Sequence, residues 1–401
     1  MWNTIGATVY LFCQWLITII VVWQYDDYIN AGNLALAMSV TNFFFCIAVY
    51  NIRAFQVSDA SEEYTDSDYV SARVLTCALS VILCAIFIYA FDYSALQRNV
   101  ILCYMIFRAI EALIDVMHGI DQKHWRMDFI GISAICRGVL ILATFSLLGW
   151  FYGFLPAIIA MAVVSALVGI IFDLKKTRSL AKFSFSARKK VFILLLRCSP
   201  LMIVGLTSVF IATFTRTSVE MIYGENALGI YASVVAPTLI IQAIAMFILN
   251  PLVNVFTKYL NDSNKQSFEK LLILVSVIII GLSAIVYTGA HILGNWGLTL
   301  LFGESITPHT YLLPGAVIVA GLTVCIWFLS VVYSIIRDII GLLIGSTIGA
   351  IIAVLITSSF LIRYDLNGVN YIMIISNAAA VIFLIIRYLA IKKKIWRKVD
   401  A

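Results

Sequence analysis

The stretch Asn99–Gln122, NVILCYMIFRAIEALIDVMHGIDQ, decides how the chain must fold, because it is long enough to cross a bilayer yet carries charges in its interior. At about 100° per residue, four polar side chains fall on one face of such a helix. These are Tyr104, Arg108, Glu111 and Asp115. One charge near the bilayer centre costs about 2.5 to 3.5 kcal/mol. We therefore expect this polar stripe to face protein or water and not lipid.

Two interpretations of the stripe are open. In the first, Arg108 and Glu111 neutralise each other at a spacing of three residues, and Asp115 pairs with an Arg on a neighbouring helix. The stripe would then hold a helical bundle together. In the second, the stripe lines a central cavity for a charged cargo, since ionisable groups inside a membrane are commonly functional.

The composition is typical of a membrane protein. Hydrophobic residues make up 62% of the 401 residues and charged residues 12%, and the mean hydropathy is +1.01. The first apolar run begins near Thr4 without a small-residue cleavage site, so we interpret it as a retained helix. The eight Cys show no metal-ligand spacing, which predicts buried core residues without disulfides or a metal site. No cofactor is expected.

Apolar runs long enough to span a bilayer recur along the whole chain, which predicts an all-α integral membrane protein. We count about twelve spans, near 4–23, 33–53, 70–91, 99–118, 129–149, 152–173, 192–214, 227–250, 271–291, 311–335, 339–361 and 370–390. Only Gly149–Gly153 separates the fifth span from the sixth, so a tight turn is expected there.

The loops between these spans differ in charge. With the N-terminus inside, 21 of the 27 Lys and Arg fall on the inner side. The positive-inside rule then predicts cytoplasmic N and C termini in a multi-pass protein of the cell (plasma or inner) membrane. The basic tail 392–401 is interpreted as an anchor to lipid headgroups, and binding to nucleic acid is not expected.

The most basic loop, Lys175–Lys190, contains no acid and lies near the middle of the chain. It divides six spans from six. We therefore expect an N-terminal lobe at 1–180 and a C-terminal lobe at 181–401. A weak internal repeat supports this division, because Leu34–Val40 and Leu228–Val234 match at the start of the second span of each half.

Two local motifs resemble a known family. The first is Asn51–Asp59, NIRAFQVSD, an amphipathic connector that follows the second span. The second joins Thr215–Arg216 to the Tyr-Gly pair at 223–224 and to Ala227–Tyr231. Both resemble Wzx-type flippases of the multidrug/oligosaccharidyl-lipid/polysaccharide (MOP) exporter superfamily, and the twelve-span plan extends the resemblance over the whole chain.

The resemblance implies two six-helix lobes around a cavity that opens alternately to each side of the membrane. It also implies transport of an undecaprenyl-diphosphate-linked oligosaccharide from the inner to the outer leaflet, for assembly of a surface polysaccharide. The partners would be this lipid-linked oligosaccharide and membrane lipids, with a polysaccharide polymerase or glycosyltransferases as possible protein partners.

A lipid-linked diphosphate needs cations at the depth where its headgroup crosses. Arg108 and Arg137 lie at similar distances from the inner ends of their spans, so they could clamp a diphosphate together. Glu111 and Asp115 could instead neutralise both Arg side chains. Three further Arg residues are candidate cargo contacts, each with an alternative interpretation. Arg53 either receives the cargo at the inner mouth or acts as a membrane anchor. Arg197 either faces the cavity or snorkels to the surface, and Arg216 either contacts the cargo or forms an outer ion pair with Glu220.

Two other functions compete with flipping. A drug-cation antiporter of the same superfamily would need net acidic spans, whereas Arg108, Arg137 and Arg197 balance or outnumber the acids in the spans here. A membrane enzyme such as a polysaccharide polymerase or ligase would need a larger outer loop than His291–Thr310. The chain contains no GxxxxGK[ST] motif for ATP. We therefore predict a transporter and not an enzyme.

Overall fold

The structure is a computed structural model, which describes residues 2–25, 27–59, 63–185 and 189–399. Helical side chains at 243, 244, 246–248, 250, 251, 254, 394 and 397–399 lie outside the described part. The basic tail expected at 392–401 is therefore described only in part. No strand occurs among the described residues, which confirms the all-α fold class.

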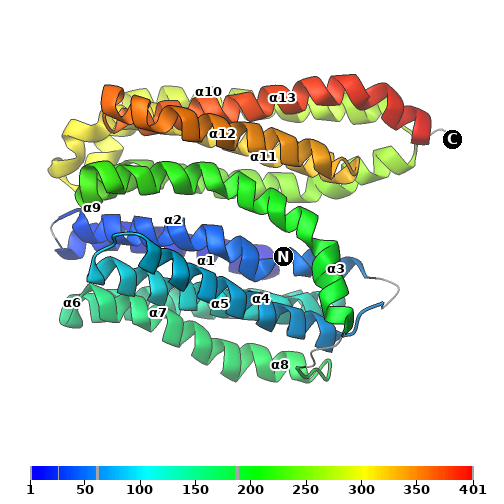
Figure 1. The fold of residues 1–401 in the computed structure, drawn as a ribbon, viewed down its shortest axis with the longest axis horizontal. Helices are drawn as coiled ribbons and strands as arrows, with labels where there is room; N and C mark the ends of the chain where they lie inside the picture. The colour runs from blue at the N-terminus through cyan, green and yellow to red at the C-terminus, as the bar shows by residue number, and fades with distance from the viewer. Residues whose placement is uncertain (1, 26, 60–62, 186–188, 400–401) are drawn as a thin grey trace. The chain divides into compact units, whose positions relative to one another are not determined.

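The chain folds as two compact units, Met1–Val209 and Phe210–Ala401. Figure 1 shows long helices running side by side within each unit. The elements of the first unit are α1 (Trp2–Tyr25), α2 (Ile29–Val49), α3 (Ile52–Ser58), α4 (Asp66–Ala90), α5 (Ala95–Lys123), α6 (Met127–Tyr152), α7 (Phe154–Val168), the π-helix η1 (Gly169–Leu174) and α8 (Lys175–Arg178). Helix α9 (Lys189–Asn261) runs from the first unit into the second.

The second unit continues with four long helices and one 3-10 helix. These are α10 (Lys265–Phe302), the 3-10 helix η2 (Glu304–Leu312), α11 (Leu313–Ile335), α12 (Ile339–Tyr364) and α13 (Asn367–Val399). Helix α13 packs against α11 and α12, and α10 packs against α11. At the inner end of this unit, the buried ring of Trp396 lies edge-on against Phe268 at 5.5 Å between ring centroids.

Ten helical segments of the described part are long and apolar enough to cross a membrane. Helix α5 is not among them, because its interior carries the charges of the polar stripe. Helix α9 is divided at Gly224, whose φ of 80° lies in the left-handed region that only glycine adopts without strain. With α5 and the two parts of α9, the expected twelve spans are confirmed.

The sequence also explains where several helices begin and turn. Thr65 and Ser94 each close a capping box at the start of α4 and α5, together with Asp68 and Gln97. The turn expected between the fifth and sixth spans is present at Gly153, where φ is 90°. At the two capping boxes the side chains satisfy backbone groups that a helix end leaves unpaired.

Helix α5 is the centre of the first unit. It packs against α2, α3, α4, α6, α7, η1 and α8, and a hydrogen bond from Tyr10 joins it to α1 as well. The polar stripe of α5 is therefore surrounded by protein and not by lipid, as its charges require.

The start of α9 belongs to the first unit. Val191, Leu194 and Cys198 are fully buried in one cluster with Ile52 of α3 and Tyr69 of α4. The compact units therefore divide at Val209 and not at 180, where the basic loop suggested the division between lobes. The assignment of 1–180 and 181–401 as the moving lobes stays a prediction.

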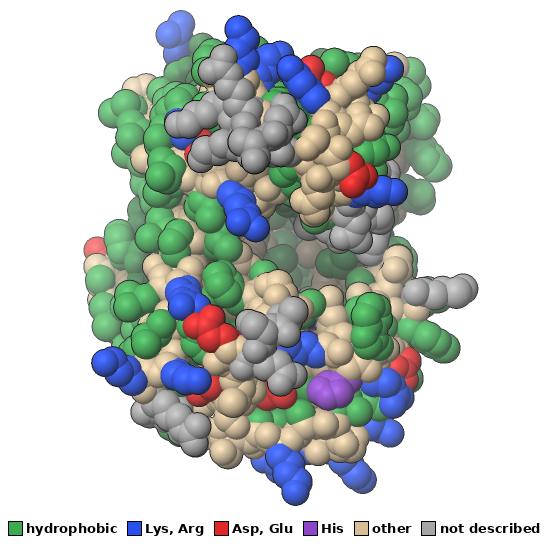
Figure 2. Space-filling view, turned by 90° about the vertical axis from the view of Figure 1, so that its right-hand side faces the viewer, with side chains coloured by type: hydrophobic (Ala, Val, Ile, Leu, Met, Phe, Trp, Pro, Cys, Tyr) green, Lys and Arg blue, Asp and Glu red, His purple; other side chains and the backbone are tan. Residues whose placement is uncertain are grey.

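Lys and Arg outnumber Asp and Glu at the end of the first unit where α3 and α8 lie (right in Figure 1, facing the viewer in Figure 2). This end carries the loops that the sequence places on the inner side. The positive-inside rule therefore predicts that this end faces the cytoplasm.

Candidate functional site

The inner half of the polar stripe is built around Asp115. Its carboxylate accepts a hydrogen bond from Arg53 Nη1 of α3 at 2.9 Å and one from Arg73 Nη2 of α4 at 2.8 Å. Arg73 is fully buried and also donates to the carbonyl oxygen of Ala48 at 3.0 Å. The expectation that Asp115 pairs with an Arg of a neighbouring helix is confirmed, with two Arg residues in place of one.

Glu111, one turn before Asp115 on α5, binds groups from three other helices. Its carboxylate accepts from Arg137 Nη1 of α6 at 2.5 Å, from the Tyr10 hydroxyl of α1 at 2.7 Å and from Ser165 Oγ of α7 at 2.9 Å. Glu111 therefore reaches away from its own helix. The pairing with Arg108 expected at three residues' spacing is absent from the ion pairs of the described residues.

Arg137 continues this network toward the inner end of the first unit. Its Nε donates to Ser133 Oγ at 3.3 Å, and Ser133 Oγ donates to Asp173 Oδ2 at 2.9 Å. Asp173 lies in the π-helix η1 and also pairs with His118 Nε2 at 3.0 Å. All four side chains are buried, so Arg137 is held in a buried polar network.

Arg108 differs from the other cations of the stripe. It is half-buried, its Nη2 donates to the neutral Asn42 Oδ1 at 3.2 Å, and its guanidinium lies over the ring of Phe45 at 3.7 Å from the centroid. No acid of the described residues lies within ion-pair distance of it. Its Nε is buried without a hydrogen-bond partner in the described part of the chain. Arg108 is thus a mid-span cation without a described acidic counter-charge.

The connector motif Asn51–Asp59 owes its pattern to contacts with α5 and α4. Arg53 also donates to Gln122 Oε1 at 2.9 Å, and the buried Gln56 donates to the carbonyl oxygen of Val116 at 3.2 Å. Asp59 accepts from the Tyr69 hydroxyl at 2.8 Å. Arg53, Gln56 and Asp59 thus fix α3 to the rest of the first unit, whereas Ser58 donates to backbone carbonyls within α3 itself.

The two remaining candidates lie elsewhere. Arg197, near the start of α9, is about half exposed and forms an ion pair with the similarly exposed Glu63 at 2.6 Å. Arg216 is half-buried in the second unit, and its Nε is buried without a hydrogen-bond partner among the described residues. The Tyr231 hydroxyl donates to Asn370 Oδ1 at 3.0 Å. The other candidates also lie in the first unit, where ion pairs join Arg53 to Asp115 and Arg137 to Glu111. Among the contacts of the described residues none joins Arg108 to Arg137, so their joint clamp on a diphosphate stays a prediction.

Several residues of this network were missed from the sequence. His118 follows Asp115 by three residues on the same face of α5, so helical spacing could have placed it in the stripe. Arg73 was counted as an inner-side charge although it is buried, and Tyr10, Ser165 and Asp173 carry no local signal that places them near α5. Their proximity depends on how the helices pack.

Comparison with known proteins agrees with this arrangement. The sequence profile of a family described as polysaccharide biosynthesis protein matches residues 16–260, more than half of the chain. The chain belongs to this family. The match covers every charged residue of the α5 network and the division of α9 at Gly224.

A curated relative of this polysaccharide biosynthesis protein is the capsular polysaccharide biosynthesis protein CapF of Staphylococcus aureus. It is 25% identical over 307 residues, which are 73% of this chain and 74% of CapF. Together with the family match, this confirms the resemblance stated from the motifs.

Solved structures with the same fold include the lipid II flippase MurJ in an inward closed conformation, with a TM-score of 0.75 and 14% identity over 99% of this chain and 89% of that one. The eukaryotic MATE transporter AtDTX14 matches with a TM-score of 0.70 and 16% identity, over 99% of this chain and 96% of that one. At these identities the likeness shows the fold alone, which is that of multi-pass membrane transporters of the MOP superfamily.

Within that fold, the pairs of Asp115 and Glu111 fasten α5 to its neighbours, because breaking a buried ion pair leaves an uncompensated charge. Arg108 stands apart from these pairs, as a half-buried guanidinium in contact with Asn42 and Phe45.

Proposed function

We propose that this protein is a flippase, which moves an undecaprenyl-diphosphate-linked oligosaccharide from the inner to the outer leaflet of the cell membrane. The family supports a role in polysaccharide biosynthesis, and the fold supports membrane transport. The protein acts by alternating access of its two lobes and is not an enzyme. Its partners are the lipid-linked oligosaccharide, membrane lipids, and the polymerase or glycosyltransferases that make and use the cargo.

The observation that carries the proposal is the state of Arg108. Every other charged residue of the stripe binds an opposite charge, whereas Arg108 contacts an amide and an aromatic ring. A guanidinium in this position offers donors to a phosphate without first breaking an ion pair. It would repel a cationic drug, which disfavours the antiporter alternative.

The other candidate Arg residues act at different positions along the proposed path. Arg53 lies near the inner end of the stripe with its side chain 29% exposed, so it receives the diphosphate there while Asp115 holds it in place. Arg137, held in place by Glu111, is the second proposed contact of the diphosphate beside Arg108. Arg197 acts at the inner surface, and Arg216 in the second unit acts on the outer half of the path.

The proposal is tested by reconstituting the full chain into liposomes with a fluorescent polyprenyl-diphosphate-linked oligosaccharide. A membrane-impermeant reductant bleaches only the outer leaflet, so flipping exposes the inner-leaflet pool to bleaching. We expect full bleaching with the native protein and only outer-leaflet bleaching with Arg108→Ala.

The matched control is Arg126→Ala, because Arg126 is an inner-side cation paired with Asp128 at the start of α6, outside the stripe. This variant should flip cargo at the native rate. The proposal is wrong if the native protein bleaches no more lipid than protein-free liposomes, or if Arg108→Ala flips cargo as fast as the native protein.

A further inference from the structure

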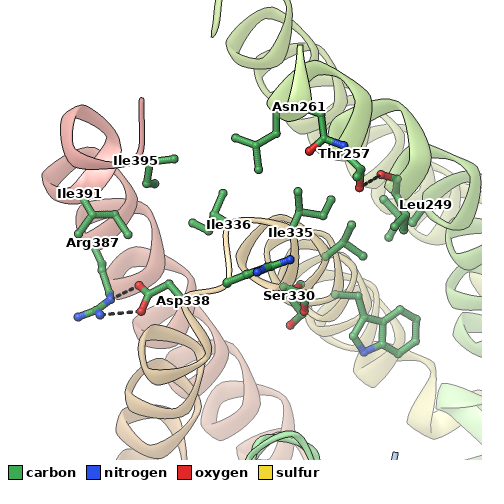
Figure 3. Close-up of a pocket in the computed structure, with 16 residues that line it drawn as sticks. Leu249, Thr257, Asn261, Ser330, Ile335, Ile336, Asp338, Arg387, Ile391 and Ile395 are labelled. Carbon is green, nitrogen blue, oxygen red and sulfur yellow. Dashed lines mark hydrogen bonds and ion pairs between the residues drawn. The ribbon is translucent and has the colours of Figure 1, made fainter. Parts of the chain in front are cut away.

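The second unit contains a partly open pocket that the proposed function does not use. It has a volume of about 1120 Å³ and lies at one end of the unit, between α9, α11 and α13. Figure 3 shows Ile335, Ile336, Ile391 and Ile395 around it, contributed by α11, the turn after it and α13. The walls are mainly aliphatic, with polar groups such as Asn261 near the end of α9. A pocket of this size and lining is suited to an apolar ligand with one polar end.

The charges around this pocket leave one cation uncompensated. Asp338 is neutralised by Arg387, whose Nε and Nη2 donate to its two carboxylate oxygens at 2.6 and 2.8 Å (Figure 3). Arg337, the neighbouring residue, also lines the pocket and is exposed. No acid of the described residues forms an ion pair with it. The lining therefore carries a single net positive charge, at Arg337.

The backbone fixes where this cation is presented. Arg337 has a φ of 59°, in the left-handed region, and its N–H donates to the carbonyl oxygen of Ser334 at 3.2 Å at the end of α11. It belongs to the short turn between α11 and α12, which the charge distribution places on the cytoplasmic side. Lys258 of α9 and Lys392 of α13 flank the pocket-lining residues in sequence. The mouth of the pocket thus lies at the depth of the inner-leaflet headgroups.

We propose that this pocket binds an anionic phospholipid of the cytoplasmic leaflet, of the phosphatidylglycerol type. The phosphate contacts Arg337, the glycerol hydroxyls of the headgroup meet Asn261 and Ser334, and an acyl chain lies along the aliphatic walls. Basic pockets between membrane helices on the cytoplasmic side bind such headgroups. The cargo is a poorer fit, because a diphosphate carries about two charges and the pocket offers one free cation.

The proposal is tested by native mass spectrometry of the full chain in non-ionic detergent. Phosphatidylglycerol and phosphatidylcholine with identical acyl chains are titrated separately. One cation near the surface contributes about 1 kcal/mol, which corresponds to about a fivefold preference for phosphatidylglycerol. We expect Arg337→Gln to remove this preference and Arg363→Gln, an exposed Arg at the opposite end of α12, to retain it.

A second variant tests the cavity itself. Ile391→Trp fills the pocket from α13 and should weaken binding of both lipids, while circular dichroism monitors folding. Equal affinity for the two lipids in the native protein, or an unchanged preference in Arg337→Gln, would overturn the proposal. Displacement of phosphatidylglycerol by one equivalent of undecaprenyl diphosphate would also overturn it, because the pocket would then belong to the cargo. None of these results depends on flipping, so the proposal stands or fails separately from the proposed function.

Discussion

At the residue scale, the polar stripe of α5 separates charges that hold the fold from one charge that does not. Asp115 and Glu111 each accept hydrogen bonds from Arg side chains of other helices. Arg108 has an amide and a ring as its neighbours. The ion pairs of Asp115 and Glu111 should therefore govern the stability of the folded protein, and Arg108 should govern transport.

The chemistry of Arg108 predicts an intermediate result for Arg108→Lys. An ammonium keeps the positive charge but loses the planar fork and the face that lies on Phe45. In the liposome assay, Arg108→Lys should flip cargo more slowly than the native protein and faster than Arg108→Ala. A native rate would mean that charge alone suffices at this position. A rate as low as that of Arg108→Ala would mean that the guanidinium geometry is essential.

The Arg137–Glu111 pair predicts a strong coupling in stability. Arg137→Met leaves Glu111 buried without its counter-charge, and Glu111→Gln leaves Arg137 in the same state, each at a cost of about 3 to 5 kcal/mol. The double variant should unfold with a smaller loss than the sum of the two, as measured by thermal unfolding in detergent. Additive losses would show that the two residues do not stabilise each other. Because the double variant leaves neither residue charged without its partner, it tests better than Arg137→Met alone whether Arg137 contacts the cargo.

The sequence predicted the stripe, and it offered the pairing of Asp115 with an Arg of a neighbouring helix as one of two interpretations, because both follow from helical spacing and the cost of burying charge. It could not predict that Glu111 binds Arg137 and not Arg108. The sequence allows either Arg as the partner of Glu111, and which of them binds depends on how α6 packs against α5. Arg73 was missed for a related reason, since the positive-inside rule counts a cation without showing that packing buries it.

At the element scale, two glycines bring the backbones of α1 and α6 into contact. A Cβ on Gly6 of α1 would lie 2.4 Å from the carbonyl oxygen of Gly131 in α6, and a Cβ on Gly131 would lie 2.4 Å from that of Trp2. Small residues let membrane helices approach closely enough for their backbones to touch. The sequence did not reveal this contact, because glycine is common in membrane helices in general.

This contact predicts that Gly131→Ala separates α1 from α6 and lowers thermal stability in detergent, by about 1 to 3 kcal/mol for an overpacked site. The matched control is Gly281→Ala in α10, where nothing lies within 4 Å of the added Cβ. That variant should be neutral or slightly stabilising, because alanine is the better helix former. Similar behaviour of the two variants would contradict the close approach of α1 and α6.

The start of α12 predicts a pH dependence. Asp338 accepts from the backbone N–H of Gly341 and binds Arg387, and the hydrogen bonds from Arg387 hold the pKa of this carboxyl below its usual range. A depressed pKa adds stability above the unfolded-state pKa of about 3.9, and this stability is lost as the pH falls through the folded-state value. The melting temperatures of the native protein and Asp338→Asn should therefore differ at neutral pH and converge in acid.

Asp262→Asn, at an exposed turn residue before α10, provides the control for this pH series. Its melting temperature should follow that of the native protein throughout. A constant difference between the native protein and Asp338→Asn down to acid pH would show that the carboxylate charge does not support α12.

At the scale of the whole molecule, the number of spans decides on which side of the membrane each loop lies. Between Lys182 and Arg363 the chain crosses five times, through the two parts of α9 and through α10, α11 and α12. An odd number of crossings places these two positions on opposite sides. The count depends on Gly224, since α9 without its break would contribute one long helix.

Cysteine labelling tests this count in a background in which the eight native Cys are replaced by Ala, because four of them are buried and Ala preserves small apolar packing. A membrane-impermeant thiol reagent should label Lys182→Cys only from the cytoplasm and Arg363→Cys only from outside. Asn226→Cys, exposed just after the break, should also label only from outside, because α9 turns back into the membrane there. Labelling of Asn226→Cys from the cytoplasm, or labelling of Lys182→Cys and Arg363→Cys from the same side, would show that the chain crosses the membrane one time fewer. The twelve-span arrangement, and with it alternating access between two six-helix lobes, would then be untenable.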